Sequence, residues 1–169
     1  MIRVRRAEPG DAQRLVELAG EIGVEEGAWL LTTEVGRSVA AERRYLRAVC
    51  RHLDAAVYVV EDGERIVARL SLARDVHPAS CHVADLGLMV AASHRRRGVG
   101  KALLDQAVAW AEAVDVRKLE LHVFPWNEPA IALYESFGFE REGLRKAHYL
   151  RGGVPVDAIL MALLLVGPP

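Results

Sequence analysis

A basic segment interrupted by glycines, His94 to Leu104, reads HRRRGVGKALL. Apolar patterning places it between an expected strand and an expected helix. The N-terminus of a helix carries unpaired backbone N–H groups and the positive end of the helix dipole, so it can bind an anion. Gly98 and Gly100 would let the backbone approach a phosphate closely. Nucleic-acid binding or a simple turn with solvated arginines are the alternatives for this segment.

Two familiar phosphate-binding motifs do not fit this segment. A P-loop needs G-x-x-x-x-G-K-[ST], but Arg95 stands five residues before Gly100, and Ala102 follows the lysine. The dinucleotide fingerprint needs a third glycine where Leu103 stands. The pattern that remains is R-x-x-G-x-G, formed by Arg95, Gly98 and Gly100.

A second segment, Leu121 to Phe139, reads LHVFPWNEPAIALYESFGF. It contains N-x-x-A-x-x-L-Y-x-x-x-G-F, which begins at Asn127. With R-x-x-G-x-G upstream, this pattern resembles the GNAT superfamily of acetyl-CoA-dependent N-acetyltransferases. The resemblance covers about residues 80–165, whereas the segments before them agree only in their order.

The resemblance implies a coenzyme site. The backbone of Arg95 to Lys101 would hold the pyrophosphate of coenzyme A, and main-chain groups of residues 88–90 would pair with the pantetheine arm and polarise the thioester carbonyl. Asn127 would hydrogen-bond the arm, and Tyr134 would lie beside the sulfur. The residues expected to bind acetyl-CoA are therefore Leu88, Met89, Val90, Arg95, Arg96, Arg97, Gly98, Val99, Gly100, Lys101, Asn127 and Tyr134.

Acetyl transfer to an amine needs a neutral amine, a polarised carbonyl and a proton for the leaving thiolate. Tyr134 is the expected acid, with packing alone as its alternative role. The expected base is His122, which stands in L-H-V where ribosomal-protein acetyltransferases of this superfamily carry L-E-V. Glu120 shares the side of His122 by strand alternation, so it could orient the imidazole, act as the base, or face solvent. Asp85 and a water chain are further alternatives for the base.

Acceptor contacts are expected from loops and from the terminal hairpin. The loop from Gly23 to Glu34 holds acidic residues beside a tryptophan, and these could bind a cationic amine by charge and cation–π contact or could simply be solvated. The residues predicted to bind the acceptor are Glu25, Glu26, Trp29, Asp85 and Trp126. Glu34 stands in the same loop, and His148 and Tyr149 stand in the terminal hairpin, where similar enzymes place acceptor contacts.

The elements that position these residues follow from apolar periodicity. Strands are expected at 2–6, 56–61, 65–73, 81–91, 118–124, 139–150 and 154–165. Helices are expected at 12–22 after an Asp11 cap, at 33–51 after a Thr33 cap, at 99–114 and at 127–137. The fold class is thus α/β (α+β): a mixed, mostly antiparallel sheet of about seven strands flanked by about four helices. A parallel β-α-β crossover would lie at the coenzyme site.

Composition narrows the function classes. The chain has 169 residues, which suits one domain, and 22 Lys plus Arg against 23 Asp plus Glu, which disfavours a dedicated nucleic-acid binder. Two cysteines and scattered histidines predict no metal site. The N-terminus has no apolar signal region, and the longest apolar run, 158–166, is too short to span a bilayer. A cytoplasmic protein with no membrane or nucleic-acid partner is expected, and homodimerisation is common in the superfamily.

The predicted function is acetyl transfer from acetyl-CoA to a small primary amine, such as an amino acid or an amine-bearing antibiotic or herbicide. Two further patterns look similar to the branch that contains amino-acid and phosphinothricin acetyltransferases: L-x-L-x-V-F…N and R-G-G…D-A-I-L-M. A protein N-terminus of the ribosomal-protein type is the alternative acceptor. A non-catalytic acyl-CoA-binding module is the alternative class.

Overall fold

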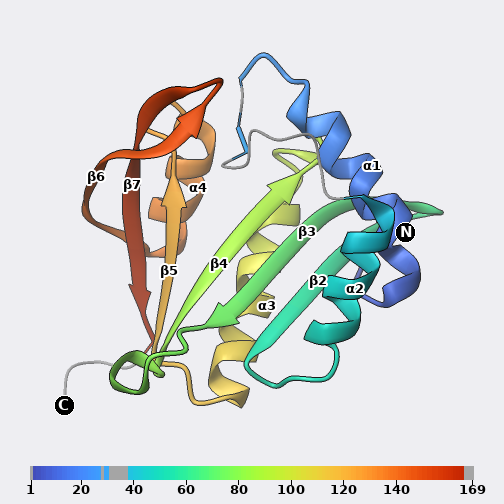
Figure 1. The fold of residues 1–169 in the computed structure, drawn as a ribbon, viewed down its shortest axis with the longest axis horizontal. Coiled ribbons are helices and arrows are strands. Elements are labelled where there is room, and N and C mark those ends of the chain that lie inside the picture. Colours follow the sequence, from blue (N-terminus) through green and yellow to red (C-terminus); the bar gives the residue numbers. More distant parts are fainter. Residues whose placement is uncertain (1, 28, 31–37, 166–169) are drawn as a thin grey trace.

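A computed structural model describes residues 2–27, 29–30 and 38–165, and these form one seven-stranded sheet with helices on both faces (Figure 1). The strands are β1 (Ile2–Arg6), β2 (Ala55–Asp62), β3 (Arg65–Arg74), β4 (Val83–Val90), β5 (Lys118–Val123), β6 (Glu140–Arg151) and β7 (Val154–Leu164). Their spatial order is β1-β2-β3-β4-β5-β7-β6, and β4–β5 is the parallel pair among antiparallel neighbours. The expected mixed sheet with one parallel crossover is confirmed.

Four helices cover the sheet. α1 (Ala12–Gly23) and α2 (Val39–Val49) lie on one face over the N-terminal strands, and α3 (Val99–Ala113) and α4 (Glu128–Phe137) lie on the other (Figure 1). Short 3-10 turns at Pro9–Asp11, Pro78–Ser80 and Ala92–His94 were not predicted. The face against α3 and α4 is apolar, as Leu119 and Leu121 show by being fully buried on β5.

Two helix starts follow from side-chain caps. Ser38 Oγ accepts from Ala41 N at 3.2 Å, so α2 begins after Ser38, and the predicted cap Thr33 lies outside the described residues. At α4, Asn127 Oδ1 accepts from Ala130 N at 3.3 Å, as an N-cap does.

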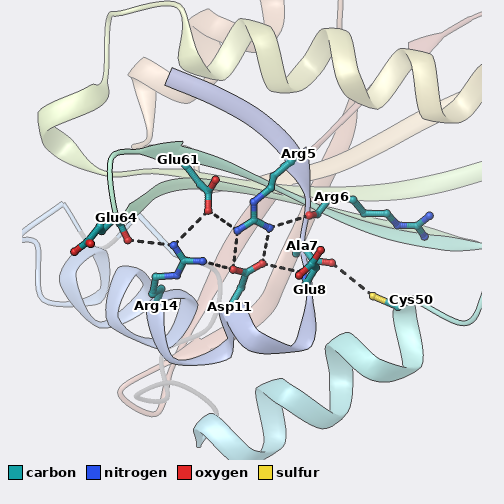
Figure 2. Close-up of polar contacts among 9 residues, drawn as sticks. All are labelled: Arg5, Arg6, Ala7, Glu8, Asp11, Arg14, Cys50, Glu61 and Glu64. Atoms are coloured by element: carbon teal, nitrogen blue, oxygen red, sulfur yellow. Dashed lines mark hydrogen bonds and ion pairs between the residues drawn. The ribbon is translucent and has the colours of Figure 1, made fainter. Parts of the chain in front are cut away.

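Asp11 stands at the N-cap position of α1, but its carboxylate does not cap that helix. Arg5 donates to both of its oxygens at 2.7 Å, and Arg14 donates to it as well (Figure 2). Both arginines also pair with Glu61 on β2. Cys50, at the end of α2, reaches the Ala7 carbonyl at 3.5 Å beside this network (Figure 2). The charged cluster therefore ties β1, β2 and α1 together.

Irregular backbone interrupts the terminal hairpin β6–β7. Arg145 pairs with Ala158 and Tyr149 with Val156, so β6 carries two more residues than β7 between these pairs. Ala147 has φ +50°, and its N–H donates to Asp157 Oδ1 at 2.7 Å. This bulge re-aims the side chains of β6, as bulges next to functional sites often do.

Within the described ranges, no helix has the length and apolar character needed to cross a membrane. In the same residues, no three His, Cys, Asp or Glu side chains cluster as they would to hold a metal ion. Cys50 and Cys81 are free thiols with solvent exposure.

Candidate active site

The central feature of the sheet is the point where β4 and β5 part. Their parallel pairing runs from Val83↔Lys118 only as far as Asp85↔Glu120, and beyond it the two strands diverge (Figure 1). A pocket of about 530 Å³ lies beside this gap. It is lined by ten of the twelve predicted coenzyme-binding residues: Leu88, Met89, Val90, Arg95, Arg96, Gly98, Gly100, Lys101, Asn127 and Tyr134.

The main chain of β4 offers hydrogen-bonding groups to this gap. Ala91 N donates to Val67 O at 2.8 Å, so odd-numbered residues of β4 carry the hydrogen bonds to β3. Because these bonds alternate along an antiparallel strand, Leu88 and Val90 direct their amide and carbonyl groups toward the gap. Val90 O accepts from Arg95 Nε at 2.9 Å, which leaves the Leu88 groups to receive a ligand.

The turn before α3 has the backbone shape that its glycines suggested. Gly98 has φ +79°, and Arg96, a non-glycine residue, has φ +60°. The first backbone N–H groups of α3 are unpaired within the helix, and the start of the helix lies at the pocket, which Gly98, Gly100 and Lys101 line. Arg97 is exposed and Val99 is buried, and neither lines the pocket.

Gly100 serves the packing of α3 as well as the approach of a ligand. A Cβ added there would lie 2.7 Å from Leu133 Cδ2, so the absent side chain lets α4 approach α3. Leu133 lines the same pocket.

Asn127 and Tyr134 enter the pocket from α4. The Oδ1 atom of Asn127 caps the helix, which leaves its side-chain N–H groups as the donors available to a ligand. Tyr134 is buried, and burial raises the pKa of its phenol. The phenol therefore keeps its proton at neutral pH, as a proton donor must.

Glu25 was predicted to bind an amine, and its contacts argue against that role. Arg95 NH1 and NH2 donate to its two oxygens at 2.7 and 2.8 Å, and Trp29 Nε1 donates to it at 2.9 Å. The carboxylate is thus already paired with a cation of the chain itself. Arg95 is likewise held by Glu25 and by Val90 O, so its guanidinium positions the loop and does not reach freely for a phosphate. Glu25 and Arg95 lie 70 residues apart in the chain, and local periodicity in the sequence cannot predict a contact between residues so far apart.

The loop that carries Glu25 bridges the two halves of the opened sheet. Gly27 O accepts from Trp126 Nε1 at 3.2 Å, and Leu30 O accepts from Arg151 NH1 at 2.8 Å. Trp126 stacks on Phe124 with 4.5 Å between ring centroids. Trp126 thus holds the loop, beside the pocket that Trp29 lines. Glu26 is exposed, and Glu34 lies outside the described residues.

The opposite face of the sheet brings the predicted bases together. Asp85 on β4 stands opposite Glu120 on β5, and His122 follows two residues later on the same side. Glu120 Oε1 lies 2.8 Å from Lys118 Nζ, so this carboxylate is already paired. Burial and the charge of Glu120 raise the pKa of Asp85, and the positive charge of Arg145 opposes them.

His122 has one occupied and one unoccupied ring nitrogen. Its Nδ1 lies 2.7 Å from Tyr149 Oη, and its Nε2 is buried with no hydrogen-bond partner among the described residues. Burial and the positive charges of Arg145 and His148 lower the pKa of the imidazole, and Glu120 opposes them. The lowered pKa makes the imidazole neutral at pH 7, and His122 can act as a base through Nε2 in the tautomer whose Nδ1–H donates to Tyr149 Oη.

Sequence reasoning missed Arg145 in this cluster, and it named Tyr149 only as an acceptor contact. Alternation along β6 gives no reliable face for either residue, because the bulge after Arg145 shifts the register. The signal that could have found them was the unusual run of polar residues, RKAHY, in a strand otherwise expected to alternate.

Comparison with known proteins gives the family. The model of the acetyltransferase (GNAT) family matches residues 24–139, and the chain belongs to this family. It is 39% identical over 102 residues to the L-amino acid N-acetyltransferase AaaT of Escherichia coli, a match that covers 60% of this chain and 62% of that protein. It is 41% identical over 70 residues to the E. coli [ribosomal protein bS18]-alanine N-acetyltransferase, with 41% and 47% covered. The matched part thus spans about half to three-fifths of these curated relatives.

The fold also matches solved structures. A Salmonella typhimurium acetyltransferase structure described with its cofactor acetyl-CoA superposes with a TM-score of 0.87, covers 100% of this chain and 96% of that one, and is 17% identical. At that identity the likeness concerns the fold, and it confirms the expected GNAT-type sheet and helices.

Proposed function

We propose that the chain is an acetyl-CoA-dependent N-acetyltransferase that moves the acetyl group directly to the primary amine of a small molecule, and that its 169 residues form one catalytic domain. The observation that carries the proposal is the opening between β4 and β5. The motif residues of both segments line a pocket at this opening, and His122 and Asp85 lie on the other side of the sheet.

The pocket supplies the groups that acetyl-CoA requires. Backbone N–H groups at the start of α3, after the left-handed Gly98, suit a pyrophosphate. The amide and carbonyl of Leu88 suit the amides of a pantetheine arm, which would lie along β4 as an added strand does. The N–H groups of Asn127 reach the same space.

The transfer itself is a direct displacement. The amine nitrogen attacks the thioester carbonyl carbon, the carbon–sulfur bond breaks, and the thiolate leaves with a proton from Tyr134. His122, directly or through water, takes the proton that the amine loses. The α-amine of a peptide N-terminus has a pKa of about 7.7–8.0. The neighbouring carboxylate of a free amino acid raises that pKa, so nearly all of a free amino acid carries an ammonium group at pH 7 and a base must take its proton.

Amino acids are the acceptor class that we favour. The support is the 39% identity over 102 residues to a relative named for L-amino acids. The alanine at a protein N-terminus is the second candidate, supported by the relative named for ribosomal protein bS18.

The test is release of coenzyme A thiol from acetyl-CoA with a panel of acceptors. The panel contains the L-amino acids, simple primary amines, and a peptide with an N-terminal alanine. We expect turnover with at least one free amino acid and confirmation of the N-acetyl product by mass spectrometry. Tight binding of acetyl-CoA without turnover on any amine would instead support a non-catalytic binding module.

A further inference from the structure

Two opposite charges flank His122, and neither is neutralised by a partner. In the part of the chain that the structure describes, neither Asp85 nor Arg145 forms a hydrogen bond or an ion pair through its side chain. Both are solvent-accessible. Lys118 and Glu120, on the strand that carries His122, are already paired: Lys118 binds Glu120 and Glu142, both at 2.8 Å.

Strand register places Asp85 and Arg145 on one face of the sheet. Residues directly opposite each other in neighbouring strands point to the same side, and so do residues two apart in one strand. Asp85 is opposite Glu120, and His122 is two residues from Glu120. On β7, Leu160 is opposite His122. Ala158 lies two residues from Leu160 on the same strand and is opposite Arg145. Arg145 therefore shares the face of His122.

Arg145 is close enough to act on this cluster. Its positive charge lowers the pKa of His122, Asp85 and Tyr149, although burial raises the last two. Another arginine of this face, Arg69, cannot substitute for it, because Arg69 NH1 pairs with Glu42 Oε1 at 2.9 Å and its Nε donates to Ser71. Arg145 therefore offers, beside the proposed base His122, a guanidinium that has no hydrogen-bonding or ion-pair partner among the described residues.

We propose that Arg145 binds the carboxylate of a free α-amino acid acceptor, while Asp85 attracts its ammonium group and His122 lies between them. This inference rests on the proposed function and adds the residue that selects the substrate class. A guanidinium donates two parallel hydrogen bonds to a carboxylate, which gives both orientation and specificity. An amino-acid zwitterion carries one carboxylate for Arg145 and one ammonium group for Asp85. An amino-acid amide or a peptide N-terminus has no carboxylate at this position.

The experiment compares each L-amino acid with its own amide, using acetyl-CoA and the full chain. We expect the wild type to prefer the acid over the amide. Arg145→Gln should lower kcat/KM for the acid about 10- to 100-fold, the loss expected for a charged hydrogen-bonding partner, and leave the amide within about threefold. Arg145→Lys should recover part of the loss, since it restores the charge without the paired donors.

Arg141→Gln is the matched control. Arg141 lies on the same strand but is opposite Met161, on the helix-covered face, and it pairs with Glu135 at 2.9 Å. It should leave both substrates unchanged. Circular dichroism and thermal unfolding of each variant separate a folding defect from a lost contact, and the Lys variant keeps the test open if the Gln variant is unstable.

The outcomes distinguish the two proposals. Acetylation of no acceptor by the wild type would overturn the proposed function and this inference together. Acetylation of amino acids with Arg145→Gln affecting acid and amide alike, or neither, would overturn the role of Arg145 and leave the acetyltransferase standing. A wild type that prefers amides or peptide N-termini to free amino acids would do the same.

Discussion

Glu25 and Arg95, 70 residues apart in the chain, form a bidentate ion pair with N–O distances of 2.7 and 2.8 Å. It joins the loop after α1 to the turn before α3. Because Trp29 donates to the same carboxylate, one acidic side chain fixes both the loop and the arginine of the R-x-x-G-x-G motif. The motif arginine thus has an internal structural role that its sequence pattern does not reveal.

Glu25→Gln should loosen this loop. The substitution removes the charge from a partly buried pair, which we expect to weaken loop closure by about 1 kcal/mol, or roughly fivefold in the opening equilibrium. Amide hydrogen exchange in the segment around residues 24–30 should speed up accordingly. The KM for acetyl-CoA should rise as well, because Trp29 of this loop and Arg95, the partner of Glu25, both line the coenzyme pocket.

Glu26→Gln is the control for this experiment. Glu26 is the adjacent acidic residue, is exposed, and has no side-chain partner among the residues that the structure describes. It should leave exchange and kinetics unchanged. Equal exchange rates in the two variants would show that the ion pair does not hold the loop.

Tyr134→Phe should separate coenzyme binding from chemistry. A phenol is protonated at neutral pH, and burial raises the pKa of Tyr134 further, so its hydroxyl is available to donate a hydrogen bond to the leaving thiolate. Its loss should lower kcat by about 100-fold, the range for general acid catalysis, and should leave coenzyme A affinity nearly unchanged because the ring still fills its place. Stopped-flow rates and calorimetric titration measure the two quantities. An unaltered kcat would leave Tyr134 as a packing residue.

The sequence could predict which residues share the pocket beside the β4–β5 opening because its signals are local. The glycine turn, the Asn127 cap and Tyr134 all depend on the start of a helix or on helical spacing, and local backbone preferences determine them. The sheet class followed from the order of the elements. The bounds of most strands differ by one or two residues from those expected, because strand ends depend on the partner strand.

The acceptor side could not be predicted in the same way. Whether Glu25 is free or paired depends on Arg95, which only the folded chain brings near. The faces of Arg145 and Tyr149 depend on the β6 bulge, which alternation cannot locate. Strand β2 likewise runs one residue beyond the expected end at 61, because Asp62 pairs with Arg65 inside the sheet and Gly63 and Glu64 connect β2 to β3.

The pH profile should report the titration of His122. A free histidine has a pKa of about 6.5, and burial with the charges of Arg145 and His148 lowers that of His122, against the opposing effect of Glu120. The base form therefore predominates above a midpoint that lies below 6.5. We expect kcat/KM to rise with pH through that midpoint and then to level off, until the amine itself titrates.

His122→Gln should abolish this rise of kcat/KM at acidic pH, the acidic limb of the profile, and should lower kcat/KM by about 100-fold or more. Tyr149→Phe should keep the limb but lower the rate less, because Tyr149 only orients the ring through Nδ1. If the limb persists in His122→Gln, Asp85 becomes the base, since burial and Glu120 raise its pKa. Asp85→Asn would then remove the limb.

The charged cluster at the N-terminus should govern acid stability. Burial acts to raise the pKa of Asp11, but hydrogen bonds from Arg5, the Glu8 amide and Arg14 lower it to about 2 from the usual 3.8. A carboxyl whose pKa is lower in the folded state stabilises the fold above its unfolded pKa. That stabilisation, about 2 kcal/mol, is therefore full above pH 4 and is lost as the pH falls toward 2.

Asp11→Asn should thus lower the free energy of unfolding at pH 7 by about 2–4 kcal/mol, since it leaves two arginines without their buried partner. Urea denaturation at pH 7 and pH 3 measures the effect, and the variant should lose less stability than the wild type between the two. Asp105→Asn is the control: Asp105 pairs with Lys101 at 3.0 Å on an exposed helix face, and its loss should cost about 0.5 kcal/mol or less. Equal losses in the two variants would mean that the Arg5–Asp11–Arg14 cluster contributes no more than a surface pair.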